Sequence, residues 1–454
     1  MKLQKTFIGL ALAATIAAVP ALAQEAAPAA EAAVEAAAEA PAFAAAADTA
    51  YIFNTLLFLM GGFLVMWMAA GFAMLEAGLV RSKNVSMQCL KNIALYSIAG
   101  LMFWITGYSI MYVGVDGGYF GSIGAYSFDD VGGNALDTGY STASDWFFQM
   151  VFCATTASIV SGTLAERIKL WPFLIFTVIL TGILYPITGS WQWGGGWLSE
   201  MGFSDFAGST LVHSVGGWAA LSGAILLGAR KGKYGPSGAV HPIPGSSMPL
   251  ATLGTFILWL GWFGFNGASQ LAMGTIGDVT DVSRIFANTN LAACGGVVAA
   301  MILTQILYKK VDVTMALNGA LAGLVSITAE PLAPTPLMAV VIGAVGGLIV
   351  VVAVPMLDKM KIDDVVGAIP VHLLAGIWGT LAVPLTNADT SFALQAVGIV
   401  SIGAFTLVTS AIVWMALKAT VGIRASEEEE AMGLDQAEVG VEAYPEFGIG
   451  SGRL

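Results

Sequence analysis

A succession of apolar segments runs through this sequence, each about as long as a helix that crosses a lipid bilayer. Hydrophobic residues make up 57% of the 454 residues and charged residues only 11%, which a soluble domain of this size does not tolerate. We therefore predict an all-α polytopic membrane protein with eleven transmembrane helices. The eleven segments cover approximately residues 50–79, 92–114, 145–165, 171–190, 206–229, 249–273, 285–307, 312–331, 336–357, 366–386 and 392–417.

The basic residues lie almost entirely in alternate loops. Two of the 18 Lys and Arg residues, Lys2 and Lys5, precede the first segment, which leaves 16. Fourteen of these follow odd-numbered segments: Arg81, Lys83, Lys91, Arg167, Lys169, Arg230, Lys231, Lys233, Lys309, Lys310, Lys359, Lys361, Lys418 and Arg424. Because positively charged loops stay on the cytoplasmic side, eleven spans predict an external N-terminus and a cytoplasmic C-terminus.

The two ends of the chain differ in composition from its middle. Residues 1–23 have a basic start, a short apolar run and an Ala-Leu-Ala cleavage site, which predict a secretory signal peptide; an uncleaved anchor is the alternative. Residues 24–48 are rich in Ala, Glu and Pro and are expected to form a disordered linker. The membrane domain is expected at 49–417 and a cytoplasmic tail at 418–454. We expect a bacterial plasma (inner) membrane location, with a periplasmic N-terminus after cleavage.

One motif, D-x-x-G-x-x-x-V-H-x-x-x-G, occurs twice, at 205–217 and 364–376. Its histidines, His213 and His372, each follow their Asp by eight residues, a rise of about 12 Å in an α-helix. This is close to half of a hydrocarbon core of about 30 Å. A single His there is more often a structural residue bonded to nearby backbone, whereas a matched pair favours a functional site.

The two copies are expected to cross the membrane in opposite directions, since the fifth segment enters from outside and the tenth from inside. Similar sequences in opposite orientation indicate an inverted repeat of helices 1–5 and 6–10, with helix 11 as an addition. A substrate path is expected at the repeat interface, lined by His213 and His372.

Few ionisable residues lie within the segments themselves. Glu76 is near the inner end of the first segment, where a structural pair with Arg81 or Lys83 is expected rather than an ion relay. An apolar path with two imidazoles suits a small solute that forms hydrogen bonds and can be neutral.

Three aromatic residues have two interpretations each. Trp193, in the outer loop 189–197, belongs either to an interfacial aromatic belt or to a face that holds a cation. Phe152 and Phe265 lie inside apolar segments, where most aromatic side chains serve packing and fewer form a gate. Their spacing alone does not separate these interpretations.

Composition also argues against several function classes. A net charge of -12 argues against nucleic-acid binding. Cys89, Cys153 and Cys294 have neither metal-ligand spacing nor a disulfide framework, so we expect no metal site and no cofactor. A redox enzyme with His213 and His372 as haem ligands remains a rival interpretation, which an absorbance spectrum would decide.

Several long motifs, taken together, resemble the ammonium transporter family (Amt/Mep/Rh), in particular its bacterial Amt branch. The resemblance covers nearly all of residues 50–445. The motifs are AGFAMLEAGLVRSKN (70–84), GTLAERI (162–168), DFAGSTLVH (205–213), GWFGFNGAS (261–269), NTNLAA (288–293), LNGALAGLVSITA (317–329) and DDVVGAIPVHLLAGIWGT (363–380).

The resemblance implies a homotrimer of eleven-helix protomers, each with its own pore for ammonium, ammonia and methylammonium, and no enzymatic activity. By motif, Trp193 and Ser269 match an outer ammonium recruitment site with Phe152 beside it. Asp205 matches the acidic residue behind that site.

The same resemblance assigns the inner part of the path. Phe152 and Phe265 match a stacked gate, and His213 and His372 match a histidine pair that lines the pore. Ammonium would lose a proton after the gate, but whether the proton follows ammonia is left open by the sequence.

The tail and two rival functions complete these expectations. The tail resembles the family's C-terminal regulatory segment, which implies control by a PII-type signal protein, although Val439-Gly440-Val441 departs from the usual His-Gly-Glu. An ammonium sensor is one rival, but the tail is too short for a fused signalling domain. An Rh-like gas channel is the other, and Trp193 weighs against it.

Overall fold

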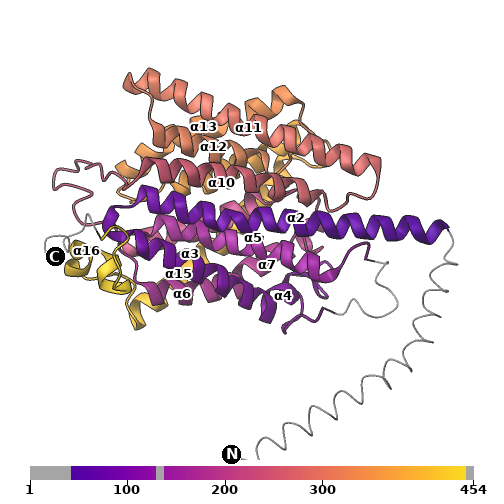
Figure 1. Ribbon diagram of the computed structural model, residues 1–454, viewed down its shortest axis with the longest axis horizontal. Helices are drawn as coiled ribbons and strands as arrows, with labels where there is room; N and C mark the ends of the chain where they lie inside the picture. The colour runs from indigo at the N-terminus through magenta and orange to yellow at the C-terminus, as the bar shows by residue number, and fades with distance from the viewer. Residues whose placement is uncertain (1–41, 129–137, 446–454) are drawn as a thin grey trace, which may run out of the picture.

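The protein is described here from a computed structural model, which covers residues 42–128 and 138–445. Within these ranges the chain is helical, with two isolated β-bridges and no strand. Figure 1 shows the long helices lying roughly along one common direction. The expected signal peptide (1–23) and most of the expected linker lie outside the described residues.

Most of the described helices follow one another with short connections. In chain order the helices are α2 (Ala42–Leu79), η1 (Ser82–Asn84), α3 (Val85–Met102), η2 (Phe103–Gly107), α4 (Tyr108–Tyr112), α5 (Thr142–Thr163), α6 (Leu170–Ile179), η3 (Leu180–Leu184), α7 (Tyr185–Ser190), α8 (Trp197–Glu200), η4 (Ser209–Ser214), α9 (Val215–Leu227), α10 (Met248–Gly267), η5 (Ala268–Gln270), α11 (Ile276–Tyr308), α12 (Val313–Ile327), α13 (Pro336–Lys359), η6 (Ile369–Leu374), α14 (Ala375–Ala382), η7 (Val383–Leu385), α15 (Phe392–Thr420), α16 (Glu427–Met432) and η8 (Asp435–Val439). The longer connections lie between α4 and α5 and between α9 and α10.

Each of the eleven predicted segments overlaps a helical stretch in the described ranges. Eight stretches are long and apolar enough to cross a membrane. The other three are α5, whose many Ser and Thr residues lower its hydropathy, and two shorter apolar helices, α12 and 369–385. The all-helical membrane fold is confirmed, and the crossing of these three stretches stays a prediction.

The first helix begins earlier than its apolar pattern suggests. Residues 42–48, assigned above to the linker, are the first turns of α2. Five of these seven residues are Ala, the residue with the strongest helix propensity, so the helix extends before its apolar part begins.

The two halves of the chain meet in antiparallel pairs. A Cβ placed on Gly71 of α2 would meet Leu258 of α10, and one placed on Gly78 would meet Ser247 at the start of α10. The small residues let these helices approach closely, as is usual in membrane proteins. The repeated motifs also cross antiparallel, since His213 contacts His372 while Gly376 lies against Ser209. The predicted inverted relation is therefore visible in the contacts.

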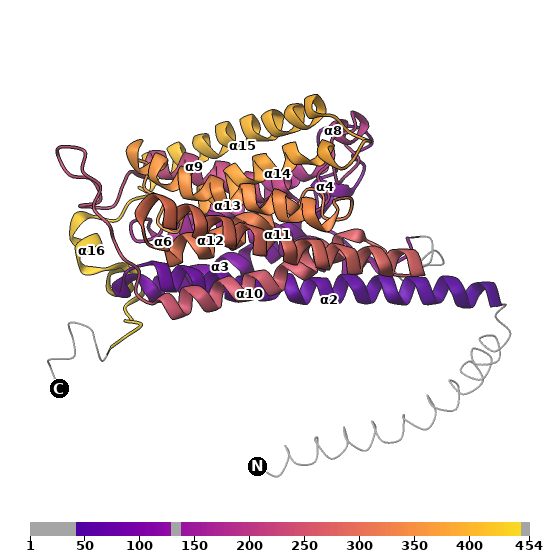
Figure 2. The same ribbon diagram turned by 90° about the horizontal axis from the view of Figure 1, so that it is seen from above.

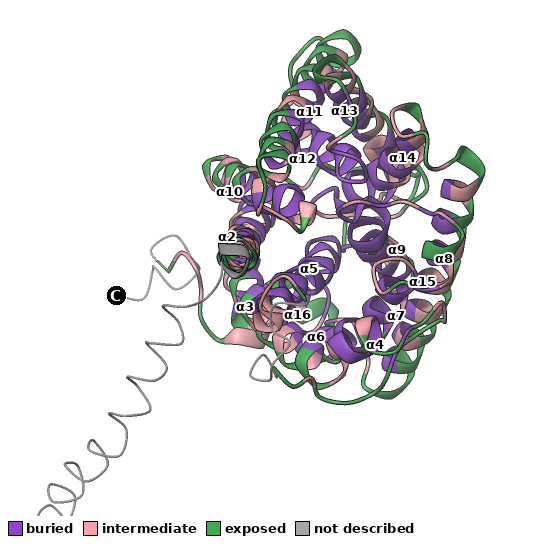
Figure 3. Cartoon of the chain, turned by 90° about the vertical axis from the view of Figure 1, so that its right-hand side faces the viewer, coloured by how far each residue is buried: buried purple, intermediate pink, exposed green. Residues whose placement is uncertain are grey.

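Buried side chains concentrate in the middle of the helix bundle. Viewed from one end, α5 and α9 lie inside the bundle, and exposed residues lie on its outer rim (Figure 3). Nearly all of α5 is buried. From above, α15 lies along one side and α2 with α10 along the opposite side (Figure 2). α5, which carries Phe152, and α9, which follows the turn with His213, are thus enclosed by the others, whereas α10, which carries Phe265, lies at the side (Figure 2).

The tail folds back onto one end of the bundle. The Lys83 ammonium donates hydrogen bonds to the backbone oxygens of Glu430 and Ala431. The backbone N–H of Met87 donates to Asp435. Loops that were predicted to share the inner side therefore do lie together, beside the tail.

Candidate functional site

Each histidine of the repeated motif lies in a short π-helical turn at the start of a helix, His213 in η4 and His372 in η6. Just before these turns, Gly208 and Gly367 have φ values of 104° and 80°. A residue with a Cβ seldom adopts such left-handed values, which explains the glycine in both copies. π-Helical turns are rare and occur often at functional sites.

The aspartates of the motif cap these turns. The Asp205 carboxylate accepts hydrogen bonds from the backbone N–H groups of residues 208–211, at 2.8 to 3.0 Å. Asp364 accepts from Gly367 at 3.2 Å and from Ile369 at 2.7 Å. Both carboxylates therefore fix the start of a helix and stabilise its positive end.

The two imidazoles touch. Their Nδ1 atoms are 3.1 Å apart, and His213 is fully buried while His372 is 3% exposed. When both rings are neutral, one Nδ1 must donate and the other accept, so the rings carry opposite tautomers. The Nε2 of His213 has no hydrogen-bond partner among the described residues. This pore pair can exchange a proton and still offers a polar atom to a ligand.

The pore pair does not fit the rival haem interpretation. Two imidazoles that bind one haem iron lie on opposite faces of the haem plane. These two rings instead touch through their Nδ1 atoms and stack directly on each other. Among the described residues, no cluster of three or more His, Cys, Asp or Glu is arranged to hold a metal.

Phe152 and Phe265, the predicted gate, stack face to face with ring centroids 3.9 Å apart and an angle of 24° between the rings. Both side chains are buried. Phe265 in turn stacks on His213 at 5.2 Å. The gate and the pore pair thus form one continuous row of rings, hereafter the aromatic row: Phe152, Phe265, His213 and His372.

The predicted recruitment residues lie at one end of this row. The Trp193 indole stands edge-on to Phe152 at 6.0 Å, and its Nε1 donates to the backbone oxygen of Asp205 at 2.9 Å. The Ser269 hydroxyl donates to the backbone oxygen of Phe265 at 2.8 Å, which leaves its own oxygen free to accept. Trp193 and Ser269 are both partly exposed.

Two aromatic neighbours of the pore pair were not predicted. Trp262 stacks on His213 at 5.0 Å, and Phe72 lies 6.2 Å from His372. Both occur in motifs quoted above, at 261–269 and 70–84, but their spacing gave no signal of a contact with histidine. Trp262 lies three residues before Phe265, on the same helix face, and this position is the one sequence signal that could have indicated a shared contact.

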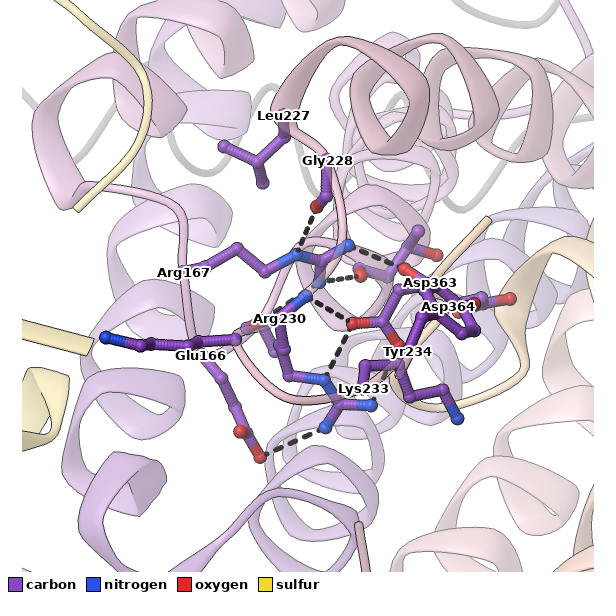
Figure 4. A network of polar contacts seen from close by, with 12 residues as sticks. Glu166, Arg167, Leu227, Gly228, Arg230, Lys233, Tyr234, Asp363 and Asp364 are labelled. Atoms are coloured by element: carbon purple, nitrogen blue, oxygen red, sulfur yellow. Dashed lines mark hydrogen bonds and ion pairs between the residues drawn. The ribbon is translucent and has the colours of Figure 1, made fainter. Parts of the chain in front are cut away.

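The far end of the row leads towards a cavity of about 360 Å³, hereafter the inner vestibule, which is lined by Pro370 and Gly367 just before His372. Arg230 and Lys233 are among its lining residues. Figure 4 shows Arg230 bridging Glu166 and Asp363 at this end of the bundle, with both Asp363 carboxylate oxygens 2.9 Å from the guanidinium. Burial alone would raise the pKa of Asp363, but the Arg230 hydrogen bonds and the Arg167 charge lower it well below its usual range.

The structure overturns the expected partner of Glu76. Arg81 forms its ion pair with Glu166 instead, and Lys83 bonds to the tail. Glu76 is buried one to two turns before these basic residues, and it accepts a hydrogen bond from Ser161. The prediction failed because Arg81 lies beyond the last turn of α2, in extended backbone, so its side chain reaches Glu166 and not Glu76.

Comparisons with known proteins agree with this geometry. A protein-family model described as Ammonium Transporter Family matches residues 56–444. The ammonium transporter Amt2 of Archaeoglobus fulgidus is 42% identical over 421 residues, which cover 86% of this chain and 87% of the relative. A putative ammonium transporter of Synechocystis is 40% identical over 409 residues, or 87% of this chain and 91% of the relative. A solved structure titled Sensor Amt Protein has a TM-score of 0.80 and 36% identity, covering 85% of this chain and 98% of that chain.

Proposed function

Since the chain belongs to the ammonium transporter family, whose members are transporters rather than enzymes, we propose that it carries ammonium or ammonia across a membrane along the aromatic row. The observation that best supports this path is the unbroken stacking from Phe152 through Phe265 to the touching imidazoles.

Recruitment takes place at Trp193 and Ser269. An ammonium ion is costly to move into an apolar core, so part of its water shell must be replaced first. The indole face attracts a cation, and the free lone pairs of the Ser269 hydroxyl accept an N–H bond. The backbone oxygen of Asp205 accepts a hydrogen bond from the indole at 2.9 Å, and the buried carboxylate of the same residue adds a negative charge. Methylammonium presents the same charge and is expected to enter as well.

Passage then requires the gate to part and the ion to lose a proton. Phe152 and Phe265 are in face-to-face contact, so the solute passes only when a ring rotates. Beyond them the walls are apolar, which favours ammonia over ammonium. The pore pair supplies one donor and one acceptor, enough to bind ammonia and take the proton.

The cellular location, the orientation and the assembly of the protein belong to the same proposal. We place the protein in a bacterial inner membrane after removal of residues 1–23, with 24–41 as an external linker and uptake directed into the cell. The tail (418–454) faces the cytoplasm, where a PII-type protein controls the inner vestibule. The protomer assembles as a homotrimer. The clustering of basic loops beside the tail supports this orientation.

A sensor is the second candidate function. It is favoured by the structural relative titled Sensor Amt Protein. In that case, the chain binds ammonium at Trp193 and reports it through the tail, with little net transport. An Rh-like gas channel would move ammonia without charge.

The deciding experiment applies ammonium pulses to proteoliposomes and records charge movement together with internal pH. Wild type is compared with Asp205→Ala and with the double variant His213→Ala/His372→Ala. A saturable wild-type current that both variants reduce supports transport along this path. Alkalinisation without current indicates the gas channel, and ammonium binding with neither signal indicates the sensor.

A further inference from the structure

Glu76 is a buried carboxylate that has no role in the transport path described above. It is 1% exposed and lies in the last turn of α2. Its Oε2 accepts a hydrogen bond from the Ser161 hydroxyl at 2.8 Å. Its Oε1 has no hydrogen-bond partner of good geometry, although the Asn92 amide lies nearby. A buried carboxylate oxygen without a partner is costly and calls for a functional explanation.

This carboxylate shares a small cavity with the pore pair. Glu76 and His372 both line a space of about 10 Å³, hereafter the inner cavity, which is about the smallest cavity that can hold one water. Phe72, one helical turn before Glu76, lies against the His372 ring. One turn of α2 is a rise of about 6 Å, so Glu76 follows His372 by about that distance in the direction of the tail.

A buried positive charge stabilises this carboxylate in its ionised form. Lys91 of α3 is fully buried, and its ammonium donates to the backbone oxygen of Ser161 at 2.8 Å. Ser161 therefore connects the two charges through its hydroxyl and its carbonyl. The titratable groups near Glu76 are Lys91 and Cys89 on α3 and His372 on η6. Burial disfavours the ionised form of Glu76 and the Lys91 charge opposes that effect, so this carboxyl group can both accept and release a proton.

We infer that Glu76 accepts the proton that ammonium leaves on the pore pair, an inference that rests on the proposed function. An N–H bond of ammonium breaks and its proton binds an imidazole nitrogen. The imidazolium passes a proton to one water in the inner cavity, and that water gives a proton to Oε1 of Glu76, which becomes a carboxylic acid.

The proton then leaves on the tail side. Asn318 and Val366 line both the inner cavity and the inner vestibule, so the two spaces adjoin at these side chains. The carboxylic acid releases its proton to water of the vestibule and is again a carboxylate. Ammonia and the proton thus take separate routes after the pore pair, and the electric current depends on Glu76 while ammonia flux does not.

The experiment measures both quantities in the same proteoliposomes: charge from an ammonium pulse and alkalinisation of the lumen by ammonia. Glu76→Gln is expected to reduce the current at least tenfold and to leave ammonia flux within about twofold of wild type. Because Gln leaves Lys91 without its counter-charge, Glu76→Gln/Lys91→Met is measured beside it. This pair removes both charges and is expected to behave in the same way. Glu76→Asp keeps a carboxylate and is expected to retain part of the current.

The remaining outcomes would contradict either the role of Glu76 or the proposed function. A wild-type current in the charge-neutral double variant overturns the inference, because the proton then passes without Glu76. Loss of both current and flux in that variant also overturns it and shows a structural role. Flux without current in wild type removes the proton route but leaves transport intact. Absence of both signals in wild type refutes transport itself.

Discussion

Asp205 and Asp364 are residues with the same local task at opposite ends of the path. Both cap a π-helical turn, but only Asp205 lies behind Trp193. We expect Asp205→Asn and Asp364→Asn each to lower the free energy of unfolding, because Asn replaces one of the two accepting carboxylate oxygens with an NH2 group, which cannot accept a hydrogen bond from the backbone. An unsatisfied buried N–H costs about 1–3 kcal/mol.

Only Asp205→Asn is expected to raise the ammonium concentration at half-maximal current, since it also removes a negative charge near the recruitment site. Denaturant titration in detergent measures the first effect, and currents at graded ammonium concentration measure the second. An equal rise in Asp364→Asn would contradict the recruitment role of Asp205.

At the scale of helices, contacts between glycines and the facing helix decide which substitutions are tolerated. A Cβ on Gly71 would lie 2.8 Å from Leu258 Cγ and 3.0 Å from its backbone N, inside the α2–α10 contact. A Cβ on Gly100 of α3 would lie 3.8 Å from Met150 Sδ, an ordinary contact. Gly71→Ala is therefore expected to destabilise the protein by about 1–3 kcal/mol.

Gly100→Ala is the matched control, since it improves helix propensity by up to about 1 kcal/mol without a clash. Thermal unfolding of both variants in one detergent checks the prediction. Equal unfolding temperatures would mean that α2 and α10 are not in such close contact.

The helices also show where sequence reasoning was reliable and where it was not. Apolar length and loop charge predicted the helical stretches, and the repeated motif predicted that His213 and His372 meet. The estimate of depth assumed an α-helix from Asp205 onward, whereas residues 205–208 are not helical and η4 starts at Ser209. His213 is thus only about 6 Å into its helix. The left-handed glycine that causes this break is visible in sequence only as a glycine.

At the scale of the whole molecule, a buried ionic network joins loops from both halves at the tail end. Asp363 has a lowered pKa, so it stabilises the fold fully above its unfolded value of 3.8 and loses this contribution as pH falls below it. We expect Asp363→Asn to cost about 3–5 kcal/mol at pH 7, because the buried Arg230 loses its closer carboxylate and keeps only the 3.4 Å contact with Glu166.

The stability difference between wild type and Asp363→Asn is expected to shrink as pH falls from 5 to 3. Unfolding curves at several pH values test this sign. A difference that stays constant with pH would show that the carboxylate charge does not contribute.

The antiparallel crossing of the two motifs has a consequence for direction. In the proposed path His213 and His372 occupy equivalent places in halves of opposite orientation, although the Phe152–Phe265 stack lies on one side of them only. Whatever its shape, a passive barrier of this kind slows forward and backward passage equally and cannot act as a valve. Net flow must then follow the concentration and voltage gradients across the membrane. The unlike entrances, Trp193 at one end and the ionic loops at the other, alter how readily each side is loaded but not where equilibrium lies.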